Sequence, residues 1–281
     1  MKLEQALFKQ IDETEAKVLK KYERWLTQYF KMLPWPKIER LKKGSFRLEK
    51  AGMVDKIIPR PDEKGLAKLL GEHGSKMVIA GRAHGDRLIK DLHRLYGGEK
   101  LAEYPEFAFD YTADLRLIPA QAVEAMEKRA LVLAGNVGGD IVSSVKKVVI
   151  SHLVEVSRKE AEEQIADILK ANRDRGSLIV TTETTYAYNR GRLASFAEHE
   201  VDYVQFSAIM DKRTSVQCRT RHGLIMAMDD HRLAANTPPL HGRCRSVLVP
   251  VYKVYQTELL TPKNLNWSEV APLPKGWGME A

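Results

Sequence analysis

The feature that most limits the fold of this chain is a long helical repeat of apolar residues at its start. Between Leu3 and Leu33, apolar residues recur mainly at steps of three and four. This spacing places them on one face of a helix. The helix should end before Pro34, because a proline disfavours helical backbone at the residue that precedes it. The chain is therefore expected to begin with a long amphipathic helix.

Helical signals continue over most of the first 175 residues. The stretch from Asp62 to Leu95 keeps the helical spacing despite five glycines. Pro119 suits the first position of a further helix, where its missing N–H costs nothing. Another helix is expected over residues 137–156. The N-terminal part of the protein is thus predicted to be mostly α-helical.

Two local patterns refine this helical region. Ser157 and Glu160 form a capping box, in which each side chain bonds the backbone N–H of the other residue, so a helix should begin there and cover residues 161–172. Residues 36–61 contain two glycines and three prolines within one stretch of basic and apolar residues. This composition predicts a linker or an extended arm.

The pattern changes after residue 177. Residues 178–199 begin rich in β-branched side chains and continue with helical spacing, so a β segment followed by a helix is expected. Residues 201–211 alternate apolar and polar positions, as a half-buried strand does, and 224–228 and 246–255 are two more apolar, β-branched runs. The predicted fold class is α+β, with a mostly α-helical N-terminal part followed by a small α+β C-terminal core domain.

This organisation predicts four successive parts. They are a basic helical arm and linker (1–60), a helical region (61–175), the α+β core (176–255) and an extended C-terminal tail (256–281).

Positive charge is concentrated in the first part. The whole chain has a net charge of +8, and residues 1–60 hold 15 Lys and Arg against 8 Asp and Glu. Such a segment could neutralise the phosphates of a polyanion, in binding that depends on salt and not on base sequence. The alternative is a solvated helix face. The candidate contacts are Lys17, Lys20, Lys21, Arg24, Lys31, Lys42 and Lys43.

Both cysteines and three of the eight histidines lie between Cys218 and Arg245. Cys218, His241 and Cys244 are a weak zinc candidate, because zinc prefers four nitrogen or sulfur ligands and H-x-x-C is a plausible half-site. The usual partner is another close pair, whereas Cys218 and His222 give C-x-x-x-H. His222 or His231 could supply a fourth ligand.

Two other interpretations compete with zinc. The order of His231, Asn236 and His241 is similar to that of a metal-nuclease hairpin, but its spacing is compressed. In the interpretation we favour from sequence, the segment closes a domain and binds no cofactor. His241 and Arg245 would then bond loop carbonyls and the carboxylate of Asp211 or Glu183, with both cysteines as buried thiols.

The same region resembles the Mu F-like head morphogenesis proteins, which are minor capsid proteins of tailed bacteriophages. The resemblance covers about 80 residues closely and rests on spaced elements in a fixed order. Arg221 stands where some members have a second cysteine, which removes a C-x-x-C half-site. The elements form a structural core motif of Thr182, Glu183, Asn189, Arg192, Asp211, Arg213, Thr214, Cys218, Gly223, Pro239, His241, Cys244 and Arg245.

The resemblance implies a structural protein of the virion, without enzymatic activity, located inside the head near the portal vertex. Its expected partners are the portal protein, the scaffold or major capsid protein, and double-stranded DNA bound without sequence preference. The alternatives are a metal-dependent nuclease or toxin-like transferase built on the same core, and a free DNA-binding accessory factor.

The sequence gives no sign of a membrane segment. No run of about 18 apolar residues occurs, and the first residues meet charge too soon for a signal peptide. We therefore expect no membrane partner and a host-cytoplasmic location during assembly.

Overall fold

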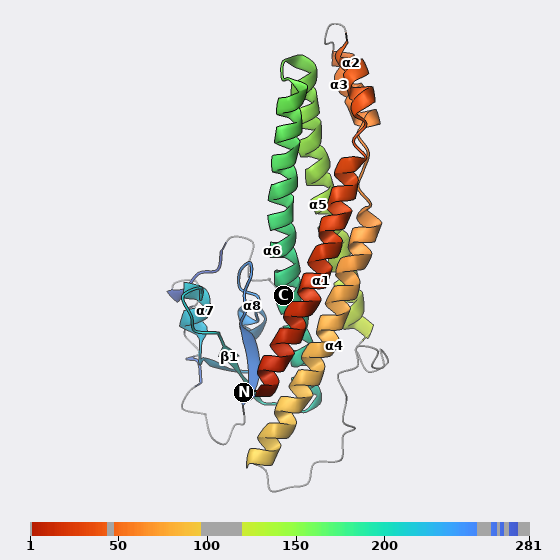
Figure 1. Ribbon diagram of the computed structural model, residues 1–281. Coiled ribbons are helices and arrows are strands. Elements are labelled where there is room, and N and C mark those ends of the chain that lie inside the picture. Colours follow the sequence, from red (N-terminus) through yellow and green to blue (C-terminus); the bar gives the residue numbers. More distant parts are fainter. Residues whose placement is uncertain are drawn as a thin grey trace. The chain divides into compact units, whose positions relative to one another are not determined.

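The computed structural model describes residues 2–43, 48–96, 120–251, 260–262, 265–266 and 270–274. The helices are α1 (Lys2–Lys31), α2 (Trp35–Lys42), α3 (Leu48–Ile57), α4 (Glu63–Tyr96), α5 (Ala120–Val154), α6 (Arg158–Glu198), α7 (Val216–Arg221) and α8 (Leu233–Asn236) (Figure 1). The strands are β1 (Tyr203–Ser207), β2 (Ile225–Ala227) and β3 (Val247–Val251). Helices dominate the N-terminal part and a small sheet lies in the C-terminal part, which confirms the predicted α+β class. None of the described helices combines the length and the hydropathy that a membrane span needs.

Backbone contacts divide the chain into two compact units. Unit 1 consists of Met1–Glu72 and Glu127–Val180, and unit 2 of His73–Met126 and Thr181–Ala281. Each unit therefore combines segments that are far apart in the sequence.

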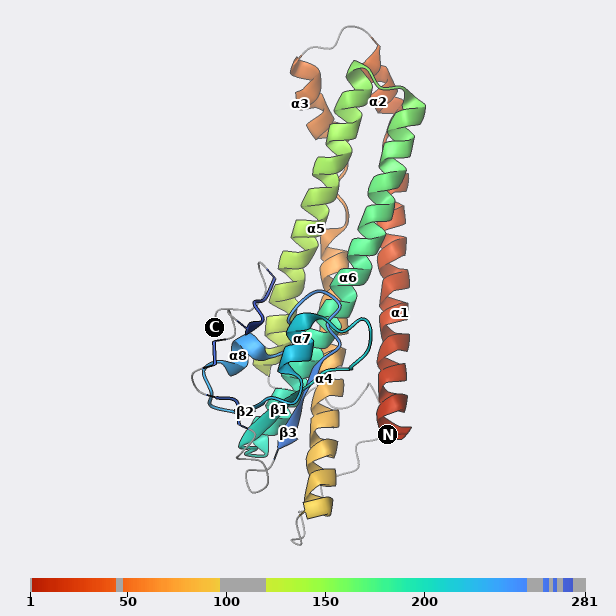
Figure 2. The ribbon, with the colours of Figure 1, turned by 90° about the vertical axis from the view of Figure 1, so that its left-hand side faces the viewer.

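Unit 1 is a helical bundle. From Ile11 onward the apolar face of α1 is buried as its spacing predicts, and the Trp25 indole N–H also donates to the carbonyl oxygen of Asp62 at 2.7 Å. Helices α5 and α6 lie side by side and antiparallel in both views (Figures 1 and 2), joined by a short turn. At that turn the capping box is confirmed, because the backbone N–H of Ser157 donates to Glu160 Oε2 at 2.9 Å and that of Glu160 to Ser157 Oγ at 3.2 Å.

The predicted linker over residues 36–61 is wrong, since α2 and α3 occupy most of it. Pro36 lies in the first turn of α2, where a proline is tolerated. Ile38, Val54 and Ile58 are buried in the core of unit 1. The burial of these side chains stabilises α2 and α3. Glycine and proline content alone predicts irregular backbone here, because it does not report on burial against distant segments.

The β segment expected at the start of residues 178–199 is also wrong, because α6 is continuous from Arg158 to Glu198. Its β-branched residues are held by tertiary contacts. Val180 is fully buried in unit 1, and the Thr185 hydroxyl donates to the carbonyl oxygen of Cys244 at 2.6 Å. Tertiary packing thus overrides the local β propensity.

Unit 2 contains the sheet, whose strand order is β2-β1-β3 with both pairings antiparallel. All three strands lie where alternating or apolar runs predict them, although residues 252–255 of the last run are outside the described residues. Val204 and Phe206 of β1 and Leu248 of β3 are fully buried. They pack with Phe196 of α6, so the sheet covers the C-terminal part of this helix.

Described residues of the predicted tail contact the sheet and α7 within unit 2. Leu260 forms a parallel bridge with Ile225, and the backbone N–H of Thr261 donates to the carbonyl oxygen of Ile225 at 2.8 Å. The Gln217 side chain of α7 donates to the carbonyl oxygen of Pro272 at 3.2 Å. This part of the tail therefore docks on the sheet and on α7.

Candidate functional site

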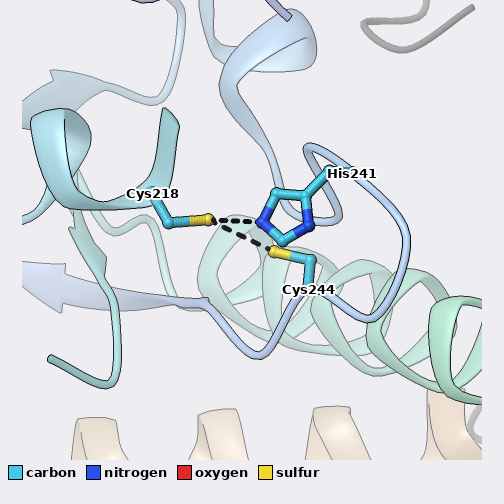
Figure 3. Close-up of side chains that lie close together, drawn as sticks. All are labelled: Cys218, His241 and Cys244. Carbon is cyan, nitrogen blue, oxygen red and sulfur yellow. Dashed lines mark hydrogen bonds between the residues drawn. The ribbon is translucent and has the colours of Figure 1, made fainter. Parts of the chain in front are cut away.

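Three side chains with metal-binding atoms converge in unit 2. The Cys218 sulfur lies 3.2 Å from His241 Nε2 and 3.6 Å from the Cys244 sulfur (Figure 3). All three candidate ligand atoms lie within 4.8 Å of one another. Both cysteines are free and buried, and the His241 side chain is partly buried. The structure thus assembles the Cys2His set that the sequence offers only as separated residues.

Cys218 is positioned by the short helix α7. The Ser215 hydroxyl caps this helix by accepting from the backbone N–H of Cys218 at 3.2 Å. At the other end of α7, the buried Arg221 donates to Asn236 Oδ1 at 2.6 Å and to the carbonyl oxygen of Ala271 at 3.1 Å. Helix α7 is therefore fastened to α8 and to the tail.

The loop that carries His241 and Cys244 is held by threonines of α6. The backbone N–H of Arg243, which has a positive φ of 58°, donates to Thr182 Oγ1 at 3.1 Å. The Thr185 hydroxyl donates to the carbonyl oxygen of Cys244 at 2.6 Å. Thr182 is thus a loop anchor, which gives this motif residue a physical role.

Asn189 joins α6 to the start of β3. Its Nδ2 group donates to the carbonyl oxygens of Thr185 at 2.9 Å and Ser246 at 3.2 Å, and its Oδ1 accepts from the backbone N–H of Leu248 at 3.0 Å. The side chain is fully buried. Asn189 therefore supplies bonds to strand backbone that would otherwise be buried without partners.

Asp211 organises a second corner of the site. Arg245 Nη2 donates to Asp211 Oδ1 at 2.7 Å, so Asp211 is the carboxylate that pairs with Arg245. The backbone N–H of Arg213 also donates to Asp211 Oδ1 at 2.8 Å, and that of Asp211 donates to Thr214 Oγ1 at 2.8 Å. The hydrogen bond from Arg245 is the main reason that the pKa of Asp211 lies below its usual range.

The remaining motif residues are placed as follows. Glu183 and Arg192 are buried on α6, and the Arg192 guanidinium lies over the rings of Tyr188 at 5.7 Å and Phe196 at 5.8 Å. Gly223 has a positive φ of 86°, which glycine adopts readily, and its backbone N–H donates to the carbonyl oxygen of Phe206 at 2.8 Å. Pro239 follows Pro238 through a cis peptide bond in the loop before His241.

The cluster favours one thiolate and one protonated imidazole. A hydrogen bond from Cys244 is the main cause that lowers the pKa of Cys218, against the opposing effect of burial. The bond to Cys218, together with burial, raises the pKa of the Cys244 thiol. The hydrogen bond between His241 and Cys218 also raises the pKa of the His241 imidazole. The negative charge therefore resides on Cys218, between two donors.

The alternative ligands from the sequence do not join this cluster. His222 Nδ1 accepts from the backbone N–H of Ala208 at 3.1 Å, and the His231 side chain is 90% exposed beside Asp230. Asn236 is buried and bonded to Arg221 instead of facing a histidine pair. Among the described residues, only Cys218, His241 and Cys244 form a group that could hold a metal ion.

The basic candidate residues lie in unit 1. Lys17 and Lys21 are four residues apart on α1, Lys21 and Arg24 three apart, and Arg24 and Lys31 seven apart, so the four lie on one helical face. Lys20 lies on the same face, three residues after Lys17 and four before Arg24. All five are exposed. We call these five residues the α1 basic stripe.

The two basic candidates in and after α2 differ from each other. The Lys42 ammonium donates to the carbonyl oxygen of Val156 at 2.8 Å and lies 3.4 Å from His152 Nδ1, so this side chain is engaged within unit 1. Lys43 is exposed at the C-terminal end of α2. Lys42 is thus a helix fastener more than a free surface cation.

Sequence analysis missed two positioning residues. Ser215 could have been found, because a serine three residues before Cys218 fits the N-cap of a short helix. Thr185 gives no comparable signal, since four threonines lie between residues 181 and 185 and nothing local distinguishes the one that reaches Cys244.

Comparison with known proteins finds one family whose model matches the part of the chain that holds this site. The family model described as "Phage Mu protein F like protein" matches residues 145–249. The match includes every residue of the structural core motif and all three members of the cluster. No significant match was found among curated proteins or among solved structures.

Proposed function

Because residues 145–249 match the family model of the phage Mu protein F like proteins, we propose that this chain is a minor head protein that acts in phage head morphogenesis near the portal vertex. Its partners would be the portal protein and packaged DNA, with scaffold or major capsid protein as further contacts during assembly.

The observation that carries this proposal is the use of the motif side chains as internal fasteners. Asn189 and Thr182 bond the backbone of the loop and strand that follow α8, and Arg245 bonds Asp211. Thr182 and Asn189 fasten the loop before β3 and β3 itself to α6, and Arg245 ties that loop to the segment after β1. A rigid core of this kind suits a protein whose work is to bind other proteins.

The α1 basic stripe supports contact with a polyanion. Its five cations span residues 17–31, or about 21 Å along a helix. Exposed cations at this density can neutralise several phosphates or meet an acidic protein surface. Contact with DNA of this kind would weaken steeply with salt and ignore base sequence.

The decisive experiment is incorporation into particles. Procapsids assembled from the portal, scaffold and major capsid proteins of the same phage would be sedimented with and without this chain, and the copies per portal counted by mass spectrometry. We expect co-sedimentation in few copies and loss of incorporation when the portal is omitted. A chain that binds DNA but sediments with neither procapsids nor portal is a free accessory factor, and that result contradicts the proposal.

Arg245→Ala gives a second arm of this experiment. Loss of the Asp211 pair should loosen the loop before β3 and lower incorporation. Arg213→Ala is the matched control, because the Arg213 side chain is 78% exposed and its guanidinium is 3.9 Å from the same carboxylate. If Arg245→Ala is incorporated as well as Arg213→Ala and the original chain, the Asp211–Arg245 pair does not matter for assembly.

A further inference from the structure

We propose that Cys218, His241 and Cys244 form a binding site for a soft divalent cation, which in a cell would be Zn²⁺. The site goes beyond the proposed role in head assembly and does not depend on it. Thiolate and imidazole ligands together select zinc over magnesium or calcium, which prefer oxygen ligands.

The distances between the candidate ligand atoms are close to those of a tetrahedral zinc site. Zn–S bonds of about 2.3 Å and Zn–N bonds of about 2.0 Å place two sulfur ligands about 3.8 Å apart and a sulfur and a nitrogen about 3.5 Å apart. The cluster has 3.6 Å between the two sulfurs and 3.2 Å between the Cys218 sulfur and His241 Nε2. The third pair, the Cys244 sulfur and the His241 nitrogen, lies within 4.8 Å, so side-chain adjustments of up to about 1 Å would seat the ion.

His241 already presents the correct nitrogen. Its Nδ1 lies 2.8 Å from the carbonyl oxygen of Gly242, which can only accept, so Nδ1 carries a proton and donates it. Nε2 then faces the two sulfurs and is available to a metal once its own proton leaves (Figure 3). A backbone carbonyl that fixes the outer nitrogen is the usual support of a metal-binding histidine.

Both halves of the site are held before any ion binds. Cys218 follows the capped N-terminus of α7, and the Cys244 backbone is bonded by Thr185 of α6. These supports order the ligands, which reduces the entropy lost on binding. The three ligands come from segments 26 residues apart in sequence, so a bound ion would clip α7 to the loop that enters β3.

Binding requires two changes in the cluster. The Cys244 thiol and the His241 imidazole must each release a proton to solvent, which converts the cluster to two thiolates and a neutral imidazole around Zn²⁺. The Ser215 hydroxyl, now 2.8 Å from Nε2, must turn away from it. Three protein ligands leave the fourth tetrahedral position for a water molecule.

The test uses the full chain purified under reducing, metal-free conditions. Zn²⁺ and, separately, Co²⁺ would be titrated into it, with Zn²⁺ measured by equilibrium dialysis and Co²⁺ by absorption. We expect one ion per chain, tetrahedral d–d bands for Co²⁺, and a thiolate-to-cobalt charge-transfer band in the near ultraviolet. X-ray absorption of the zinc form should show two sulfur and two nitrogen or oxygen ligands.

Variants assign the ligands. Cys218→Ser and Cys244→Ser should each halve the charge-transfer intensity and weaken Zn²⁺ binding by at least tenfold, and His241→Gln should weaken it similarly while keeping both thiolates. His231→Ala is the matched control, because this histidine lies in the same segment but is exposed and outside the cluster. It should leave Zn²⁺ binding unchanged.

A measurement on the unaltered chain keeps the test independent of variants that fail to fold. Bound Zn²⁺ should protect both thiols from alkylation, and a chelator should restore their reactivity. The proposal is overturned if the folded, reduced chain binds no stoichiometric Zn²⁺ or Co²⁺. It is equally overturned if Co²⁺ binds without a thiolate charge-transfer band, or if the cysteines react only by forming a disulfide with each other.

Discussion

Gly81 of α4 lies against the backbone of α6 at Tyr188, and Gly191 of α6 lies against the backbone of α4 at Val78, both within unit 2. A methyl group on Gly81 would collide with the carbonyl group of Tyr188, and one on Gly191 with the carbonyl oxygen of Val78. Each helix therefore uses a glycine to admit the backbone of the other. The contact lies beside Asn189 and Arg192 in sequence, so it sets the position of the helix on which the loop and β3 are fastened.

Gly191→Ala should destabilise unit 2 although alanine is the better helix former. The atom that the new methyl group meets belongs to the backbone of α4, which cannot rotate away, so the two helices must separate. Overpacking of this kind costs about 1–3 kcal/mol. Chemical denaturation followed by near-ultraviolet circular dichroism would measure the loss.

Gly139→Ala is the control for that substitution. Gly139 is exposed within α5, and a methyl group there has no neighbour within 4 Å. Helix propensity alone then acts, and it should stabilise the protein by up to about 1 kcal/mol. Similar losses in both variants would contradict the close approach of α4 and α6.

Asn189→Ala should remove the link between α6 and β3. The substitution leaves the backbone N–H of Leu248 and the carbonyl oxygen of Ser246 without this partner in a buried place. Each unsatisfied buried group costs about 1–3 kcal/mol, so we expect a loss of about 3 kcal/mol. Hydrogen exchange at Leu248 should accelerate most.

Asn172→Ala provides the comparison on the same helix. Asn172 donates only to the carbonyl oxygen of Ile168, one turn earlier, at 2.9 Å. Its loss should cost less than about 1 kcal/mol. Equal effects of the two substitutions would rule out a special role for Asn189.

Acidification should destabilise unit 2 through two buried histidines. Burial, with a smaller effect of Lys76, lowers the pKa of His73 to about 4, and burial, with Arg192 and Arg87, lowers that of His84 to about 3. Both stay neutral in the folded chain, whereas the unfolded chain protonates them below about pH 6.5. Stability is thus unaffected above that pH and falls below it, by about 2 kcal/mol per histidine between pH 6.5 and 5.

Denaturation midpoints at pH 7, 6 and 5 would measure this fall. His73→Gln keeps a group that can bond Thr184 and removes one of the two titrating sites. Its stability should therefore depend less on pH than that of the original chain. An unchanged pH dependence would mean that His73 protonates without cost in the folded state.

Charge reversal on the α1 basic stripe should weaken DNA binding without unfolding unit 1. Lys17→Glu, Lys21→Glu and Arg24→Glu alter exposed side chains only. If the three contact phosphates, the slope of log affinity against log salt should become shallower by about 2.7. Retention of duplex DNA at several salt concentrations measures that slope.

The matched control applies the same charge change elsewhere in unit 1. Lys147→Glu, Lys159→Glu and Lys170→Glu also alter exposed lysines, on α5 and α6. They lower the net charge equally but should leave most of the slope intact. If both triple variants lose DNA retention alike, net charge and not the stripe is responsible.

Local patterns predicted much of this fold because they report on local physics. The apolar spacing before Pro34 and the capping box at Ser157 depend on residues within one or two helical turns. The strand at Tyr203–Ser207 follows from alternation, which needs only one buried face. The same reasoning failed for α2 and α3 and for residues 178–185, where burial against distant segments decides the conformation.

The sequence by itself determined which chemical groups this protein has and most of the elements that carry them. It supplied the order of the core motif, the two thiols and the histidine. Only the tertiary structure decided that Cys218 meets His241 and Cys244, that Arg245 pairs with Asp211, and that Thr185 holds the intervening loop. The reason is that local propensity acts over a few residues, whereas these contacts join segments 23 to 59 residues apart through the packing of α6, α7 and β3.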